Sequence, residues 1–306
     1  MYPHFLGIGA QKAGTTWLHH NLQHHPDIYL PPLKELHYFD NQHHSLYTRL
    51  QQKKAYYRIA VEEFKDEITR LGFLRDSSKL AWLTRYLFWP RSDRWYASLF
   101  PDRENIVCGE ITPAYGILDA SVLEQVAHCM PQAKIIYLIR NPIHRSWSSL
   151  RMFESFNNRT VESLSPNRII QMMMSGGIFR HSEYLANLGR WERFFDRGQI
   201  FVGFMDEVKN DPTKLLRKIH QFLGVDSDES FIPETISTAR NVHKKGTIPE
   251  PVLATITEFY FDKIVELHDF FDNEYTASWL REAQDCLSNR ASTRTTSLLQ
   301  NRKQAG

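Results

Sequence analysis

A glycine-containing loop near the start of the chain has the residue types of a phosphate cradle. Gly9 and Gly14 enclose four residues that include Lys12, and Thr16 follows two positions after the second glycine. Glycines let backbone N–H groups curl around an anion, and the N-terminus of a following helix adds positive potential. The spacing matches the nucleotide-binding pattern G-x-x-x-x-G-K-[ST], except that Thr15 occupies the lysine position. We therefore expect an anion that is held without the usual magnesium ion.

An ordinary strand-to-helix turn is the alternative interpretation of this loop. A bare G-x-x-x-x-G spacing would leave the two interpretations equally open. Lys12 and the Thr15-Thr16-Trp17 run after the second glycine favour the cradle. In a nucleoside triphosphatase the lysine would reach the outer phosphates, and its displaced position here disfavours that class.

Strands and helices alternate along the chain, which predicts how the loop is positioned. The loop follows an apolar run at 5–8 that is typical of a buried parallel strand. Further strands are expected at 105–110, 134–139 and 199–204, and helices at 15–24, 41–74, 120–129, 143–153, 166–175, 182–195, 212–223 and 249–271. This alternation predicts the α/β class, with a central parallel sheet flanked by helices. We expect one domain over residues 1–286 and a flexible tail over 287–306, which lacks an apolar period.

The composition excludes several functional classes. A chain of 306 residues that is 42% hydrophobic can bury a substantial core, and its net charge of +2 gives no nucleic-acid footprint. Cys108, Cys129 and Cys286 are isolated and the histidines lack metal-ligand spacing, so we expect no metal site. No apolar run approaches the length of a transmembrane helix, and the first strand starts close to Met1. We expect a cytoplasmic protein, unless an N-terminal anchor has been removed.

The segment QKAGTTWL resembles the 5′-phosphosulfate loop of sulfotransferases that use 3′-phosphoadenosine-5′-phosphosulfate (PAPS) as donor. It is most similar to the heparan-sulfate-type enzymes and their bacterial relatives. The resemblance implies a P-loop-NTPase-like sulfotransferase fold, PAPS as co-substrate with 3′,5′-ADP as product, and no metal. It implies that Lys12 lies beside the oxygen that bridges phosphorus and sulfur. The residues implied to bind the donor are Lys12, Ala13, Gly14, Thr15, Thr16, Trp17, Arg140, Ser148, Lys244, Lys245 and Gly246.

A donor with a separate 3′-phosphate needs a second anion site. Arg140 and Ser148 resemble the family motif R-D-P-x-x-R-x-x-S, with Asn141 in place of the aspartate. A structural ion pair is the alternative role for Arg140. A strand that ends in arginine also lacks the aspartate with which a kinase-like enzyme would hold magnesium.

A late basic loop resembles the third donor contact of the family. Lys245 and Gly246 match the family's K-G pair, and Thr247 stands where the family often has arginine. A solvated basic turn is the alternative interpretation.

The segment KELHYFD at 34–40 resembles the K-E-x-H-F-F-D motif in which the glutamate is the general base. We therefore expect Glu35 to take the acceptor proton with assistance from His37, although cytosolic small-molecule sulfotransferases use a histidine. Two residues apart in an extended segment, both side chains would project from one face. Tyr38 and Asp40 are expected to contact the substrate.

The segment EITPAY at 110–115 resembles the E-K-[ST]-P-A-Y segment that lines the family's acceptor cleft. Pro113 and Tyr115 are therefore expected substrate contacts, while Ile111 replaces a lysine and disfavours a heavily sulfated polysaccharide. The sequence predicts an O-sulfotransferase that transfers the group in line to a hydroxyl of a saccharide or small molecule. A P-loop kinase-like enzyme and a non-catalytic nucleotide-binding protein are the alternatives. The oligomeric state is not indicated.

Overall fold

A parallel sheet forms the centre of the protein. The computed structural model describes residues 1–40, 77–238 and 247–304, with only the backbone of 291–304. In these residues the sheet has the strand order β2-β3-β1-β4-β5, and every pair is parallel. The strands are β1 (Phe5–Gly9), β2 (Ile28–Tyr29), β3 (Val107–Ile111), β4 (Lys134–Ile139) and β5 (Ile200–Phe204). The predicted α/β class is confirmed.

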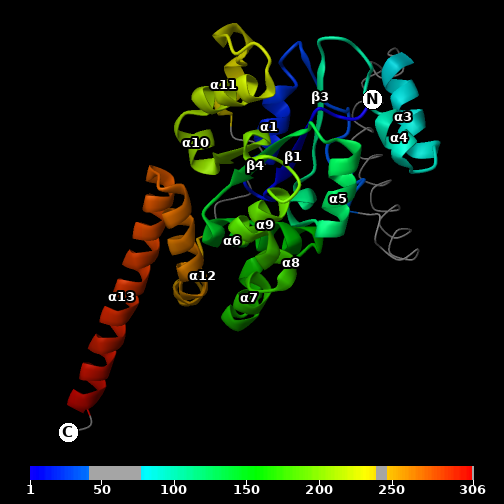
Figure 1. Cartoon of the computed structure of the whole chain (residues 1–306). Helices are drawn as coiled ribbons and strands as arrows, with labels where there is room; N and C mark the ends of the chain where they lie inside the picture. Colours follow the sequence, from blue (N-terminus) through cyan, green and yellow to red (C-terminus); the bar gives the residue numbers. More distant parts are fainter. Residues whose placement is uncertain (41–76, 239–246, 305–306) are drawn as a thin grey trace.

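Helices cover both faces of this sheet (Figure 1). The described helices are α1 (Thr15–Leu22), α3 (Ser77–Phe88), α4 (Asp93–Ala97), α5 (Ala120–Cys129), α6 (Pro142–Phe156), α7 (Pro166–Met173), α8 (Gly176–Phe179), α9 (Tyr184–Trp191), α10 (Met205–Asn210), α11 (Pro212–Leu223), α12 (Glu250–Phe271) and α13 (Glu274–Gln304), and not all of them lie against the sheet. The side chains of β4 alternate between the two faces. Ile136 and Leu138 join a core cluster with α1 and α11, whereas Ile135 and Ile139 join a larger cluster with α5, α6, α9 and α12.

The strand order places the predicted functional segments at one edge of the sheet. β1 lies between β3 and β4, with Phe5 opposite Gly109 on one side and Lys134 on the other. Because the strands are parallel, the segments that follow β1, β3 and β4 all leave the sheet at its carboxyl edge. The glycine loop, the segment after Ile111 and Arg140 are therefore neighbours.

The predicted secondary structure differs from the structure at β2 and in the C-terminal tail, and it falls outside the described residues at 41–74. The short strand β2 was not predicted, because two residues carry no periodicity. The helix expected at 41–74 lies outside the described residues. Residues 287–304 continue α13, which extends beyond the sheet in Figure 1, so this part of the tail is helical; its flexibility stays a prediction. Within the described residues, no helix has the length and apolarity needed to cross a membrane.

Candidate active site

The loop between β1 and α1 has the backbone shape of an anion cradle. Gly14 precedes α1 with a φ of 98°, a left-handed conformation that glycine adopts without strain. A Cβ atom at Gly14 would lie 3.0 Å from Met205 Sδ, which leaves little room for a side chain. The N-cap residue Gly14 makes no side-chain cap, and the positive end of the α1 dipole points toward the loop because the loop leads into the N-terminus of the helix. Of the other predicted cradle residues, Ala13, Thr15 and Trp17 are buried and Thr16 is partly exposed.

Lys12 and Arg140 lie together where β1 and β4 end. Arg140 Nη1 donates a hydrogen bond of 3.2 Å to the carbonyl oxygen of Lys12, although 128 positions separate them in sequence. The Nε atom of Arg140 is buried and has no hydrogen-bond partner among the described residues. Burial and the charges of Arg140 and Lys34 lower the pKa of Lys12. The two anion motifs predicted from the sequence are thus brought together.

Asn141 fixes the helix that follows Arg140. Its Oδ1 accepts a hydrogen bond of 3.0 Å from the N–H of Ile143, which caps α6. Its Nδ2 donates a hydrogen bond of 3.1 Å to Glu282 of α13, which also lies 2.7 Å from His144 Nε2. An aspartate at position 141 would face Glu282 with like charge, so the amide suits the C-terminal helix of this chain.

Two residues that the sequence analysis missed join α6 to the donor loop. Ser148, which was predicted with Arg140 to bind the 3′-phosphate, is partly exposed on α6, and its neighbour Ser149 is buried. Ser149 Oγ donates a hydrogen bond of 3.0 Å to Gln11 Oε1 in the loop. No local pattern marks a contact between residues 138 positions apart, so this contact could not be predicted from the sequence.

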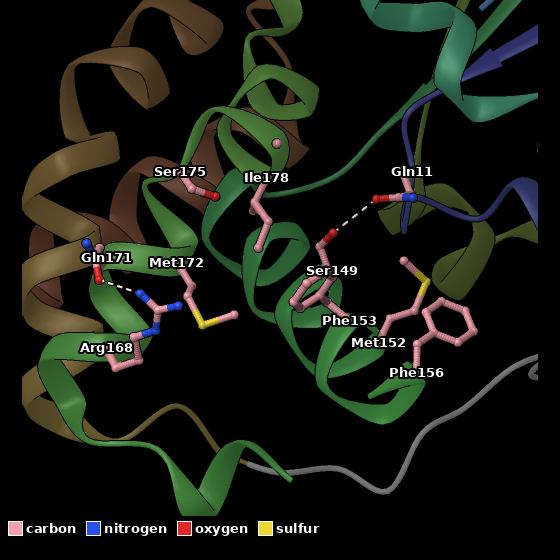
Figure 2. A pocket seen from close by; sticks show the side chains of 11 residues that line it. Gln11, Ser149, Met152, Phe153, Phe156, Arg168, Gln171, Met172, Ser175 and Ile178 are labelled. Atoms are coloured by element: carbon pink, nitrogen blue, oxygen red, sulfur yellow. Dashed lines mark hydrogen bonds between the residues drawn. The ribbon is translucent and has the colours of Figure 1, made fainter. Parts of the chain in front are cut away.

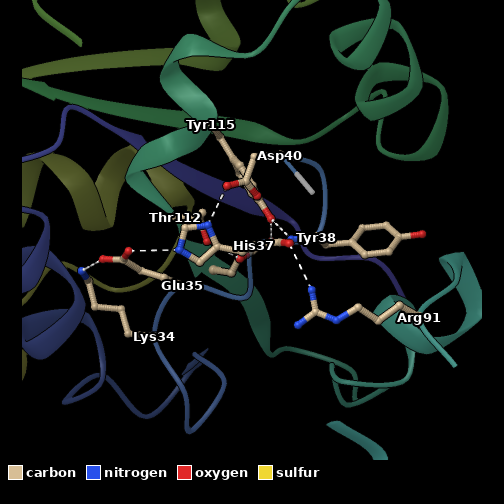
Figure 3. Close-up of polar contacts among 9 residues, drawn as sticks. Lys34, Glu35, His37, Tyr38, Asp40, Arg91, Thr112 and Tyr115 are labelled. Carbon is tan, nitrogen blue, oxygen red and sulfur yellow. Dashed lines mark hydrogen bonds and ion pairs between the residues drawn. The ribbon is translucent and has the colours of Figure 1, made fainter. Parts of the chain in front are cut away.

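The predicted base segment brings four charged side chains together (Figure 3). His37 Nε2 lies 3.4 Å from Glu35 Oε2, and His37 Nδ1 lies 2.6 Å from Asp40 Oδ2. Lys34 Nζ lies 2.5 Å from Glu35 Oε1, and Arg91 donates a hydrogen bond of 3.3 Å to the carbonyl oxygen of His37. The expected extended conformation is wrong, because Glu35 and His37 have φ values of 67° and 51°. The side chains meet because both residues have positive φ values, and strand alternation is not involved.

The ionisation of this cluster distinguishes its two candidate bases. Burial would raise the pKa of Glu35, but the hydrogen bond from His37 and the Lys34 ammonium lower it to about 2. Burial would lower the pKa of His37, but hydrogen bonds to Asp40 and Glu35 raise it to about 9. At neutral pH, Glu35 is therefore a carboxylate that can accept a proton and His37 is an imidazolium that cannot.

The stability of the protein is expected to fall as the pH rises through about 9, where His37 titrates. The pKa of His37 in the folded protein lies above the ordinary value of 6.5. Its contribution to the free energy of unfolding is therefore complete below pH 6.5 and is lost as the pH rises through about 9. The Glu35 contribution has the opposite sign: it is present above pH 4.5 and lost as the pH falls through about 2. NMR titration of the His37 ring measures its pKa. Urea unfolding midpoints at roughly pH 6 and pH 9.5, either side of this titration, measure the loss of stability that it causes.

Asp40→Asn is the variant that tests the cause of the raised pKa of His37. Removing this carboxylate removes a hydrogen bond that raises the pKa, so the titration should move to lower pH. Asp119→Asn, which alters an exposed ion pair with Arg180, is the control. An unchanged His37 titration in Asp40→Asn would contradict the described cluster.

A buried polar network supports the backbone of the base segment. The N–H of Tyr38 donates a hydrogen bond of 2.9 Å to the Tyr115 hydroxyl, which donates one of 3.1 Å to Glu110 Oε1. Thr112 Oγ1 donates a hydrogen bond of 2.8 Å to the other oxygen of Glu110, and the Tyr96 hydroxyl also donates to this carboxylate. Burial raises the pKa of Glu110. The segment after β3 therefore holds the base segment in place.

This network changes the interpretation of the residues that were expected to contact the acceptor. Tyr115 is 0% exposed and Tyr38 is 5% exposed, and Pro113 is also buried. The Tyr38 hydroxyl donates a hydrogen bond of 2.6 Å to Asp93. Asp40 is partly exposed, but its carboxylate is bound to His37. In the described residues Tyr38 and Tyr115 are buried and support the base segment, and their contact with the acceptor stays a prediction.

The remaining predicted donor residues cannot be placed. Lys244, Lys245 and Gly246 lie outside the described residues. In the described ranges, no group of three or more His, Cys, Asp or Glu side chains has an arrangement that could hold a metal ion.

The cradle after β1, the adjacent arginine after β4 and the parallel sheet together define a P-loop-like α/β fold with cationic and backbone N–H groups suited to an anion. The sequence model of the Sulfotransferase family matches residues 3–229. The chain belongs to this family, and the match favours sulfuryl transfer over the kinase-like and non-catalytic alternatives.

Solved structures show the same fold. A sulfotransferase from Alicyclobacillus acidocaldarius is similar with a TM-score of 0.61 and 23% identity, over 91% of this chain and 99% of that one. The mouse sulfotransferase SULT7A1, solved in complex with PAP, has a TM-score of 0.52 and 15% identity, over 92% of this chain and 89% of that one. The P-loop-like sulfotransferase fold predicted from the motifs is confirmed.

Curated relatives match over shorter segments. The bifunctional heparan sulfate N-deacetylase/N-sulfotransferase 1 of Caenorhabditis briggsae is 24% identical over 149 residues, which are 43% of this chain and 16% of that protein. The membrane-associated sulfotransferase kil1 of Dictyostelium discoideum is 27% identical over 150 residues, which are 48% of this chain and 22% of that protein. The chain thus matches less than a quarter of the length of these relatives.

Proposed function

We propose that the protein is an O-sulfotransferase that uses PAPS as donor and Glu35 as general base. The observation that carries this proposal is the hydrogen bond between Arg140 and the carbonyl oxygen of Lys12, which joins the two anion motifs at one edge of the sheet. The buried, unpartnered Nε of Arg140 suits an additional acceptor such as a phosphate oxygen. The SULT7A1 structure with PAP supports the choice of an adenosine 3′,5′-bisphosphate donor.

The residues of the site divide into donor-binding and acceptor-activating groups. The cradle from Lys12 to Trp17 would hold the 5′-phosphosulfate, while Arg140 and Ser148 would hold the 3′-phosphate. PAPS supplies a sulfuryl group that is activated by its link to the 5′-phosphate. The Lys12 ammonium stabilises the charge that develops on the bridging oxygen as the link breaks.

Glu35 removes the proton of the attacking hydroxyl. The acceptor oxygen forms a bond to sulfur while the bond from sulfur to the phosphate oxygen breaks, and the proton passes to the Glu35 carboxylate. The His37 imidazolium orients this carboxylate from one side and Lys34 from the other. His37 is therefore a positioning residue in this mechanism.

Arg140→Ala is expected to weaken binding of 3′,5′-ADP about 10- to 100-fold, because a charge-assisted hydrogen bond to the 3′-phosphate contributes roughly 1.5–3 kcal/mol. Binding of 5′-AMP, which lacks this phosphate, should change much less. Isothermal titration calorimetry with both nucleotides measures the difference. Arg197→Ala removes only an exposed ion pair with Glu192 and serves as the control.

The comparison of nucleotides also tests the donor itself. Equal affinity of the unaltered protein for ATP and 3′,5′-ADP would overturn PAPS as the donor. Equal weakening of 5′-AMP and 3′,5′-ADP in Arg140→Ala would overturn the assigned 3′-phosphate contact. Transfer from labelled PAPS to amines, with none to hydroxyls, would change the proposal to N-sulfation.

A further inference from the structure

A cavity of about 610 Å³ lies between the donor loop and helices α6, α7 and α8 (Figure 2). This volume is in the range of small-molecule sites. One end is formed by Gln11 of the loop and Ser149 of α6, which are hydrogen-bonded to each other. The cavity therefore lies against the loop and helix that carry the predicted donor residues.

The wall of the cavity is mostly apolar. Phe153 and Phe156 from α6 line it and are 51% and 77% exposed, which is unusual for phenylalanine. Met172 and Ile178 line the opposite wall. Methionine adapts to irregular apolar shapes, and covering exposed aromatic area releases about 25 cal/mol for each Å². These side chains would gain from an apolar occupant.

The charge of the described lining residues disfavours the donor and a polyanionic saccharide as the occupant of the cavity. Among its lining residues, Arg168 carries the one positive charge, and its Nη1 is hydrogen-bonded to Gln171 at 2.7 Å. A nucleotide with several phosphate charges, or a sulfated polymer, would require several cations. The predicted donor cations Lys12 and Arg140 are not among the lining residues.

We propose, on the basis of the function proposed above, that this cavity binds the body of the acceptor, and that the acceptor is a small hydroxylated molecule with an aromatic or alicyclic apolar frame. Its hydroxyl would lie at the Gln11 end, beside Lys12. Gln11, which lines this end of the cavity, directly precedes Lys12 in the donor loop, so the cavity reaches the residue before the predicted catalytic lysine.

Gly177 provides a substitution that fills the cavity without straining the backbone. It lines the cavity, and a Cβ atom added there meets no other atom within 4 Å. Its neighbour Gly176 has the same open surroundings but does not line the cavity. Gly177→Trp and Gly176→Trp are therefore a matched pair.

The test uses the full chain with labelled PAPS and three acceptors: 2-naphthol, a 3-hydroxysteroid and an unsulfated heparosan oligosaccharide. We expect transfer to the apolar alcohols, a KM at least about tenfold higher in Gly177→Trp, and little change in Gly176→Trp. The affinity for 3′,5′-ADP should be the same in all three proteins.

The outcomes separate this inference from the proposed function. If the protein binds 3′,5′-ADP, three results would overturn the acceptor assignment and leave the donor assignment intact. They are transfer to the oligosaccharide alone, no transfer to either apolar alcohol, and an unchanged KM in Gly177→Trp. Absence of 3′,5′-ADP binding by the unaltered protein would overturn the proposed function itself.

Discussion

Glu35→Gln is expected to lower the turnover number by roughly 10²–10⁴-fold, the usual contribution of a general base. Glutamine keeps the size of the side chain but cannot accept the proton of the acceptor hydroxyl. Because the pKa of Glu35 is lowered to about 2, its side chain is a carboxylate at neutral pH, which is the form that the proposed base requires. Steady-state rates with labelled PAPS, together with 3′,5′-ADP affinity by calorimetry, show whether the loss is in turnover and not in donor binding.

His37→Gln separates the base from the group that positions it. If His37 only orients Glu35, this variant should lose less activity than Glu35→Gln and should alter the pH profile. Glu183→Gln, which removes an ion pair with Lys263, is the control for a lost carboxylate elsewhere. A larger loss in His37→Gln than in Glu35→Gln would reverse the two roles.

Lys12→Ala should have the second large effect, a loss of about 10²–10³-fold in the turnover number. Such a loss is expected when a side chain that stabilises transition-state charge by hydrogen bonding is removed. The 3′,5′-ADP product lacks the transferred group and has Arg140 as a separate contact, so its affinity should fall by a smaller factor. Comparing turnover with product affinity in the same variant measures this difference.

Lys12→Arg tests whether charge alone explains the role of Lys12. Arginine keeps the positive charge but has a longer, planar cationic group, so we expect Lys12→Arg to recover part of the turnover that Lys12→Ala loses. Lys218→Ala, which removes a pairing with Glu207, is the control. An unaltered turnover number in Lys12→Ala would contradict the assignment of Lys12 to the leaving oxygen.

The fold could be predicted where the signal is local. The apolar run at 134–139 and the amphipathic segment at 212–223 match β4 and α11 to the residue, because burial imposes a regular period on each element. The donor loop could be predicted because its glycines, lysine and threonines lie within eight positions, from Gly9 to Thr16. The short strand β2 carries no such period.

The site was predictable in its residues but not in its contacts. Glu35 and His37 do meet, yet through two left-handed residues that no residue type at these positions signals. The bonds from Ser149 to Gln11 and from Asn141 to Glu282 join residues 138 and 141 positions apart, and only the folded chain brings them together. The burial of Tyr38 and Tyr115 likewise follows from contacts that only the folded chain makes.

The helices after residue 229 have a consequence for how much of the chain folds cooperatively. The family match ends at 229, but Ile256, Tyr260 and Ile264 of α12 belong to the larger hydrophobic cluster beside the sheet. Trp279 of α13 belongs to it as well, and its indole N–H donates a hydrogen bond of 3.2 Å to Asp206. A fragment cut at 229 would keep all five strands and expose one side of its core to water. The segment that matches the family, residues 3–229, is therefore shorter than the part of the chain that packs into one hydrophobic core, which includes Trp279.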